Sequence, residues 1–140
     1  MDFPATPARV YRDCTVHGKI LVIDDSEASL HFTSRALGRA GFEVRTTLDV
    51  NDLHAVLGGW RPDVILTDVD MPGLTGLELC RMLKSTYETA HVPVVLFSAL
   101  PSDELETVAR ECEADGFVSK ANGLDQLPYE LEMLLETTQF

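Results

Sequence analysis

Short apolar runs rich in β-branched residues alternate along this chain with longer amphipathic stretches. The first run, Lys19-Ile-Leu-Val-Ile23, suits a strand that is buried on both faces of a sheet. Four more strands are predicted at 42–46, 64–66, 93–97 and 116–118. Helices are predicted at about 26–40, 49–58, 75–85 and 102–112, and a final one lies near the C-terminus. This alternation predicts an α/β fold, a parallel sheet of five strands with helices on both faces.

Several residues mark where the predicted helices begin and end. Gly41 follows the first helix at a position typical of a C-cap, and Gly58-Gly59 ends the second, which Asp49 can cap. Thr75-Gly-Leu-Glu78 has the spacing of a capping box. Pro128 is tolerated because it falls in the first turn of the last helix. That helix is predicted to place its leucines on one side: Leu124, Leu127, Leu131, Leu134 and Leu135.

The length of 140 residues fits one domain at 18–140. Residues 1–17 contain two prolines and lack periodicity, so we expect a poorly ordered extension. No apolar run approaches the roughly 20 residues of a membrane span, and no secretory signal is evident, so no membrane association is expected. The three cysteines have no CxxC spacing, which argues against a disulfide framework or a zinc site and favours a cytoplasmic location.

The net charge of −12 is concentrated at the C-terminal end of the chain. Residues 101–140 carry ten acidic side chains and only two basic ones, Arg110 and Lys120. Such a surface repels phosphate backbones, so direct nucleic-acid binding is not expected. Two interpretations stay open: a solvated surface that keeps the protein soluble, or an acidic docking face for a basic protein partner.

Polar residues gather at the predicted strand ends. Asp24-Asp25 follow the first strand, Asp68 the third, Ser98 the fourth and Lys120 the fifth. In a doubly wound sheet, ligands bind outside the carboxyl ends of the strands. Three carboxylates at one edge repel one another unless a cation intervenes, and oxygen ligands favour Mg²⁺ or Mn²⁺. The combination indicates phosphoryl transfer to a carboxylate.

These motifs resemble the receiver domain of two-component response regulators. The matching segments are Asp24-Asp25, Asp68-Val-Asp-Met-Pro-Gly-Leu-Thr-Gly76, Ser98-Ala99 and Phe117-Val-Ser-Lys120, within about residues 18–138. The resemblance implies a flavodoxin-like (βα)5 fold with strand order 2-1-3-4-5. It also implies a stand-alone signalling switch of the chemotaxis-regulator type rather than an enzyme, or a piece of a longer chain.

The resemblance implies a role for each matching acid. Asp68 would be the phosphoacceptor and a metal ligand. Asp25 would bind the metal directly, Asp24 largely through water, and Asp70 through its backbone carbonyl.

Three further residues would complete the switch. Lys120 would pair with a phosphoryl oxygen, and Ser98 would bond the phosphoryl group and shift inward. Phe117 matches the aromatic residue that couples the site to the face made by the fourth helix, the fifth strand and the fifth helix. Partners would be a sensor histidine kinase or a histidine phosphotransfer protein, together with a downstream protein target.

The sequence departs from the family pattern after Lys120. The family usually has a proline there, preceded by a cis peptide, whereas this chain has Ala121. A cis peptide without proline costs about 2.5–4 kcal/mol, so we expect a trans peptide and a differently shaped loop.

Two other functions stay open. One is a receiver-like binding module that works without phosphorylation, an alternative raised by Ala121. The other is a phosphatase, because Asp68-Val-Asp70 resembles the DxD of haloacid-dehalogenase-like enzymes. In those enzymes the motif normally ends the first strand, but here an earlier strand precedes it.

Overall fold

The computed structural model describes residues 18–49, 51, 53–71, 74–86 and 89–138, so the predicted extension lies outside it. Five parallel strands form the central sheet in the order β2-β1-β3-β6-β7. Their bounds are β1 Lys19–Ile23, β2 Glu43–Thr47, β3 Val64–Thr67, β6 Val94–Ser98 and β7 Gly116–Ser119. The predicted fold and strand order are therefore confirmed.

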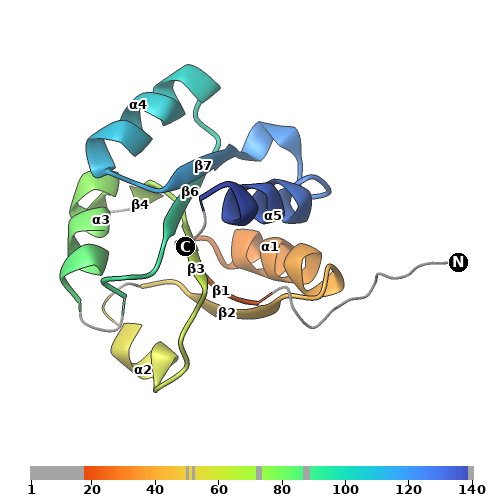
Figure 1. Cartoon of the computed structure of the whole chain (residues 1–140), viewed down its shortest axis with the longest axis vertical. Coiled ribbons are helices and arrows are strands. Elements are labelled where there is room, and N and C mark those ends of the chain that lie inside the picture. Colours follow the sequence, from red (N-terminus) through yellow and green to blue (C-terminus); the bar gives the residue numbers. More distant parts are fainter. Residues whose placement is uncertain (1–17, 50, 52, 72–73, 87–88, 139–140) are drawn as a thin grey trace, which may run out of the picture.

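Helices cover both faces of the sheet (Figure 1). Their bounds are α1 Glu27–Arg39, α2 Leu53–Leu57, α3 Gly76–Ser85, α4 Ser102–Cys112 and α5 Leu127–Thr138. Side chains alternate along β1: Ile20 and Val22 pack toward α1 and α5, whereas Leu21 and Ile23 pack toward α2, α3 and α4. Among the described residues, no helix combines the length and apolar character that a membrane span needs.

The helix signals predicted at Thr75 and Gly41 are confirmed, whereas Asp49 lies four residues before α2 and accepts instead from the Asn51 N–H at 2.9 Å. Thr75 and Glu78 form a complete capping box at the start of α3. Ser26 caps α1, its side chain accepting from the Ser29 N–H. Gly41 has φ of 103°, so it takes the left-handed conformation that follows many helices.

Some predicted boundaries were wrong. β2 and β6 begin and end one residue later than expected, and β3 and β7 each end one residue later. α2 is only five residues long. Leu124 precedes α5, in the turn that follows Gly123, although it still packs against the α1–α5 side of the core.

A short antiparallel hairpin after β3 was not predicted. Its strands are β4, Asp70–Met71, and β5, Leu74–Thr75, with Asp70 opposite Thr75. Residues 72–73, between these two strands, lie outside the described residues.

Trp60 links the end of α2 to the amino-terminal ends of the strands, which we call the amino edge of the sheet. Its indole Nε1 donates to Glu43 Oε2 at 2.8 Å, and the Arg45 guanidinium lies 4.7 Å from its ring centroid. Arg45 Nη1 also donates to the carbonyls of Val56 and Leu57, at 2.7 and 3.2 Å.

Two acids at the same amino edge each bind a backbone N–H. Asp63 Oδ2 accepts from the Lys19 N–H at 2.8 Å. Asp115 Oδ2 accepts from the Val94 N–H at 2.7 Å and pairs with Lys84 Nζ at 3.3 Å. These carboxylates tie loops to strands.

Candidate functional site

The acids at the carboxyl-terminal ends of the strands, which we call the carboxyl edge of the sheet, lie together, as the sequence predicts. Asp24 follows β1 and Asp68 follows β3, and these strands pair directly, with Ile23 opposite Thr67. The Asp68 N–H donates to the Ile23 carbonyl at 3.0 Å, which fixes the second loop beside the first. One carboxylate oxygen each from Asp24, Asp25 and Asp68 lies within 4.8 Å of the others.

The three carboxylates differ in exposure. Asp24 is buried at 3% exposure, the Asp68 side chain is 13% exposed, and Asp25 is open to solvent. The cluster therefore extends from a buried acid to a solvent-facing one. An ion or an anionic group could reach it from the solvent on the side of Asp25.

Asp24 is held by three donors. Its Oδ2 accepts from Ser29 Oγ at 2.7 Å and from Lys120 Nζ at 3.2 Å, and its Oδ1 accepts from the Ser26 N–H at 3.1 Å. Burial raises the pKa of the Asp24 carboxyl, but the bonds from Ser29, Ser26 and Lys120 outweigh burial and lower its pKa overall. Asp24 is thus a fixed anion at neutral pH.

Lys120 is the cation of the site. Its Nζ lies 3.2 Å from Asp24 Oδ2 and 3.5 Å from Asp68 Oδ2, and it sits 5.3 Å from the ring centroid of Phe97. One ammonium therefore faces three carboxylates, so the cluster keeps an excess of negative charge.

Ala121 does not prevent Lys120 from reaching the acids. No peptide bond among the described residues is cis, so the link from Lys120 to Ala121 is trans, as expected. Ser119 Oγ accepts from the Ala121 N–H at 3.1 Å and caps a short 3-10 helix, Lys120–Asn122. The loop is therefore compact without proline.

Ser98 and Phe117 lie on the two strands beyond β3. Ser98 ends β6, is 3% exposed, and accepts from the Leu100 N–H at 3.2 Å. Phe117 on β7 is half-buried and packs against the core cluster on the α4 side. It also lines a hollow of about 320 Å³ with residues of α5, including Tyr129 and Met133. Phe117 therefore lies between the core on the α4 side and the hollow beside α5.

Ser29 is the functional candidate that sequence reasoning missed. Its hydroxyl donates to Asp24 and also lies 3.5 Å from Lys120 Nζ. The available signal was a hydroxyl in the first turn of the helix that follows Asp24-Asp25. Its contact with Lys120 joins residues 91 positions apart, which no local pattern indicates.

The residues present fit a hard divalent cation. All three clustered donors are carboxylate oxygens, the ligands that Mg²⁺ prefers, and the excess negative charge would be offset by two positive charges. The Asp70 backbone lies two residues beyond Asp68, in β4.

Comparison with known proteins identifies the family. The family model described as response regulator receiver domain matches residues 20–132. Response regulator PleD of Caulobacter vibrioides is 38% identical over 102 residues, 73% of this chain and 22% of PleD. The phosphate regulon transcriptional regulatory protein PhoB of Pseudomonas aeruginosa is 30% identical over 85% of this chain and 52% of PhoB. The chain thus spans about half or less of the length of these relatives.

Solved structures agree with this match. Chemotaxis response regulator CheY4 of Vibrio cholerae superposes with a TM-score of 0.72 at 29% identity, over 84% of this chain and 98% of CheY4. A beryllofluoride-activated DrrB receiver domain gives a TM-score of 0.67 at 32% identity, over 85% of this chain and 97% of that one. This chain belongs to the response regulator receiver domain family of two-component systems.

Proposed function

We propose that this chain is a signalling switch that accepts a phosphoryl group on Asp68 from a phosphohistidine of a partner kinase or phosphotransfer protein. The observation that carries the proposal is the group of three carboxylates from two paired strand ends with one lysine between them. Its family membership supports the same reading.

In the proposed reaction, a carboxylate oxygen of Asp68 attacks phosphorus. The phosphorus–nitrogen bond of the phosphohistidine breaks, and the imidazole nitrogen keeps the electron pair and takes a proton. Lys120, now 3.5 Å from Asp68 Oδ2, would pair with an oxygen of the transferred group. Ser98 would bond another of these oxygens by turning its hydroxyl away from the Leu100 N–H.

We further propose that Asp25 and Asp68 hold Mg²⁺ directly and that the Asp70 carbonyl completes the protein ligands. Asp24 would act through water, which is consistent with its Oδ2 already accepting from Ser29 and Lys120. When bound, the cation would neutralise charge on the acids and on the transferring phosphoryl oxygens.

The signal would pass to a partner through the face made by α4, β7 and α5, with Phe117 as the coupling residue. This face combines an apolar hollow beside β7 with exposed acids on α4, among them Asp103, Glu104 and Glu106. A basic, partly apolar segment of a downstream protein is the matching chemistry. We place this exchange in the cytoplasm, where such partners would meet the chain.

The first test is intact-protein mass after incubation with acetyl phosphate, with and without Mg²⁺. We expect a Mg²⁺-dependent gain of one phosphoryl group in the wild type and none in Asp68→Asn. Asp63→Asn is the matched control, because it changes an aspartate at the opposite edge and should be labelled normally. Labelling that persists in Asp68→Asn would contradict the assignment.

A second test separates acceptance from signalling. Lys120→Ala should still take some label, but the ring signals of Phe117 should stay at their unphosphorylated positions in NMR spectra. In the wild type, beryllofluoride should shift them. If the variant shifts as the wild type does, Lys120 does not couple the site to Phe117.

A chain that takes no label and gives no response to beryllofluoride would instead be a binding module that works without phosphorylation. The trans loop at Ala121 gives this second candidate its only specific support.

A further inference from the structure

The loop that carries Lys120 is tied to α5 by a side-chain hydrogen bond. Asn122 ends the 3-10 helix that begins with Lys120, and its Nδ2 donates to Glu130 Oε1 at 2.9 Å. Glu130 lies in the first turn of α5, eight residues further along the chain. The bond therefore joins the segment that follows β7 to the helix that comes after it.

The other hydrogen bonds of this loop are local. The Ala121 N–H donates to Ser119 Oγ, and the Gly123 N–H donates to the Lys120 carbonyl, each at 3.1 Å. These bonds join residues at most three positions apart, so they shape the short helix without fixing where it lies against α5. The bond from Asn122 supplies that connection.

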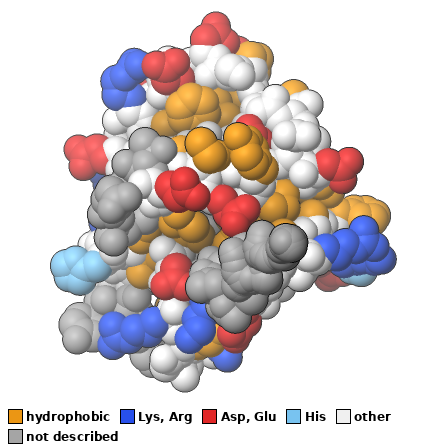
Figure 2. Space-filling model, turned by 45° about the vertical axis from the view of Figure 1, so that its right-hand side comes forward, with side chains coloured by type: hydrophobic (Ala, Val, Ile, Leu, Met, Phe, Trp, Pro, Cys, Tyr) orange, Lys and Arg blue, Asp and Glu red, His pale blue; other side chains and the backbone are white. Residues whose placement is uncertain are grey.

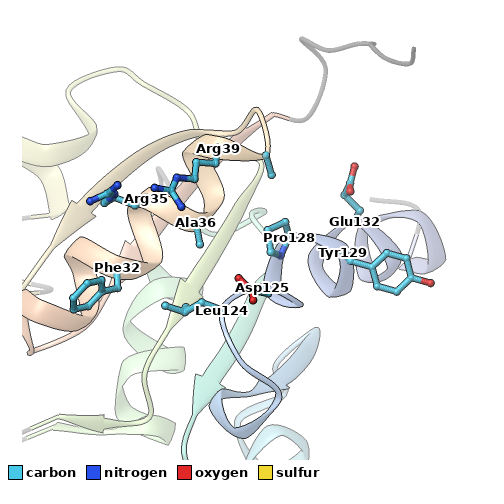
Figure 3. A pocket seen from close by; sticks show the side chains of 10 residues that line it. Phe32, Arg35, Ala36, Arg39, Leu124, Asp125, Pro128, Tyr129 and Glu132 are labelled. Atoms are coloured by element: carbon cyan, nitrogen blue, oxygen red, sulfur yellow. The ribbon is translucent and has the colours of Figure 1, made fainter. Parts of the chain in front are cut away.

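An apolar contact holds the far end of the same loop. Leu124 packs against the core cluster between the sheet and helices α1 and α5. Figure 3 shows it on the segment that leads into α5, at a groove of about 700 Å³ between that helix and α1. The bond between Asn122 and Glu130 thus lies between this apolar anchor and Lys120, where it can control the position of the lysine.

The Glu130 carboxylate is oriented toward the loop rather than toward solvent. Its Oε2 is buried and accepts no hydrogen bond within the described part of the chain. Its neighbours Tyr129 and Met133 are exposed apolar side chains, and Figure 2, which turns this side of the molecule forward, shows hydrophobic side chains among acidic ones. A buried oxygen without a donor costs free energy, so the bond from Asn122 to the other oxygen determines this orientation.

We propose that Asn122 and Glu130 are positioning residues for Lys120. Their hydrogen bond holds the loop so that the ammonium stays between two acids of the site. That ammonium lies 3.2 Å from Asp24 Oδ2 and 3.5 Å from Asp68 Oδ2. A displacement of roughly 1 Å would carry both pairs past the ~4 Å of a close ion pair. The consequence for phosphoryl transfer rests on the proposed function, in which Lys120 pairs with a phosphoryl oxygen.

The first test observes Lys120 by NMR in protein without metal or phosphodonor. Its ammonium lies 5.3 Å from the Phe97 ring centroid, so the neighbouring methylene protons carry a ring-current shift. In Asn122→Ala and in Glu130→Ala, these signals should move toward those of a solvated lysine. Signals that stay in place in both variants would overturn the proposal.

Two further variants separate the hydrogen bond from other effects. Glu130→Gln keeps an oxygen that accepts from Asn122, so it should restore most of the shift that Glu130→Ala loses. Gln126→Ala removes an exposed amide from the same loop and should leave the Lys120 signals unchanged. If Glu130→Gln behaved like Glu130→Ala, the charge rather than the hydrogen bond would matter, and the proposal would be wrong.

The second test measures the initial rate of labelling by acetyl phosphate with Mg²⁺. Asn122→Ala should slow labelling roughly three- to tenfold, the effect of one lost hydrogen bond, and Gln126→Ala should not. In a Lys120→Ala background, adding Asn122→Ala should cause no further slowing, because its effect passes through the lysine. Further slowing there would overturn the positioning role. A wild type that takes no label would contradict the proposed function, and the NMR shifts would then decide this inference by themselves.

Discussion

The two edges of the sheet use aspartate in opposite ways. At the amino edge, Asp63 and Asp115 stand apart, and each accepts a bond from a backbone N–H of a neighbouring strand. At the carboxyl edge, three aspartates converge within 4.8 Å of one another, and Lys120 pairs with two of them, Asp24 and Asp68. Aspartates that each bind their own backbone N–H therefore stabilise the fold. Aspartates that lie close to one another instead form a group suited to binding a ligand.

This contrast shows which observation has diagnostic value. An acid at a strand end is ordinary, because a carboxylate readily satisfies a loop N–H. Crowding is costly, because like charges at short range oppose ionisation and folding. A cluster of carboxylates in which this repulsion persists indicates a ligand whose binding relieves the repulsion. The proposed Mg²⁺ would do so.

The largest expected difference between the edges is their response to Mg²⁺. At a free concentration a hundredfold above the dissociation constant, the ion should stabilise the wild type by about 2.7 kcal/mol. Asp25→Asn should lose most of this gain, whereas Asp63→Asn should keep it. Thermal unfolding with and without Mg²⁺ at constant ionic strength measures both. Equal losses in the two variants would show that the ion binds without regard to the cluster.

At the amino edge, truncation should destabilise the fold. Asp115→Ala leaves the Val94 N–H and Lys84 without their acceptor, at a cost of about 1–2 kcal/mol. Urea denaturation measures the change. Glu111→Ala, at an exposed position on the neighbouring helix, is the control and should have little effect. An unchanged Asp115→Ala midpoint would mean that water replaces the carboxylate fully.

Removing a charge at the carboxyl edge should stabilise the fold, which is opposite to the effect of Asp115→Ala at the amino edge. Without divalent cations, Asp25→Asn removes one of three crowded charges and should raise the melting temperature slightly. The gain should shrink as salt rises, because Asp25 is exposed and its interactions are screened. A lower melting temperature at low salt would show that Lys120 already balances the cluster.

The smallest expected effect concerns Ser29. In Ser29→Ala, Asp24 loses a hydrogen bond that lowers its pKa, so the pKa should rise toward or above the ordinary 3.8. Carboxyl NMR titration of metal-free protein measures the shift, and Ser34→Ala on the same helix is the control.

The dependence on pH follows from the sign of that shift. Because the folded-state pKa of Asp24 is lowered, its stabilising contribution is fully present above pH 3.8 and is lost as the pH falls through the folded value. Ser29→Ala should therefore be less stable than the wild type at neutral pH, and the two should converge in acid. A constant difference at every pH would assign Ser29 to packing alone.

The sequence allowed the sheet and its acids to be predicted because both leave local signals. Buried parallel strands read as continuous apolar runs, so the ends of β1 and β3 were located within one residue, and Asp24 and Asp68 with them. The capping box at Thr75 could also be predicted from the sequence, because its two partners lie three residues apart.

The features that could not be predicted are either too short to show a sequence pattern or join residues far apart in the sequence. β4 and β5 have two residues each, too few for any periodicity to register. Leu124 matches the spacing of the α5 leucines but lies before the helix, because apolar packing does not require helical backbone. Ser29 meets Lys120 only through the fold, because the two residues are 91 positions apart.

The position of Trp60 has an optical consequence. It is the single tryptophan of the chain, and it is anchored by Glu43 and Arg45 at the amino edge, at the opposite end of the strands from the acid cluster. Its emission should therefore follow loss of the β2–α2 contacts on unfolding and stay constant when an ion or phosphoryl group arrives at Asp68. Intrinsic fluorescence is thus an unbiased stability reporter for this protein, because ligand effects on the unfolding curve will not be confused with direct quenching.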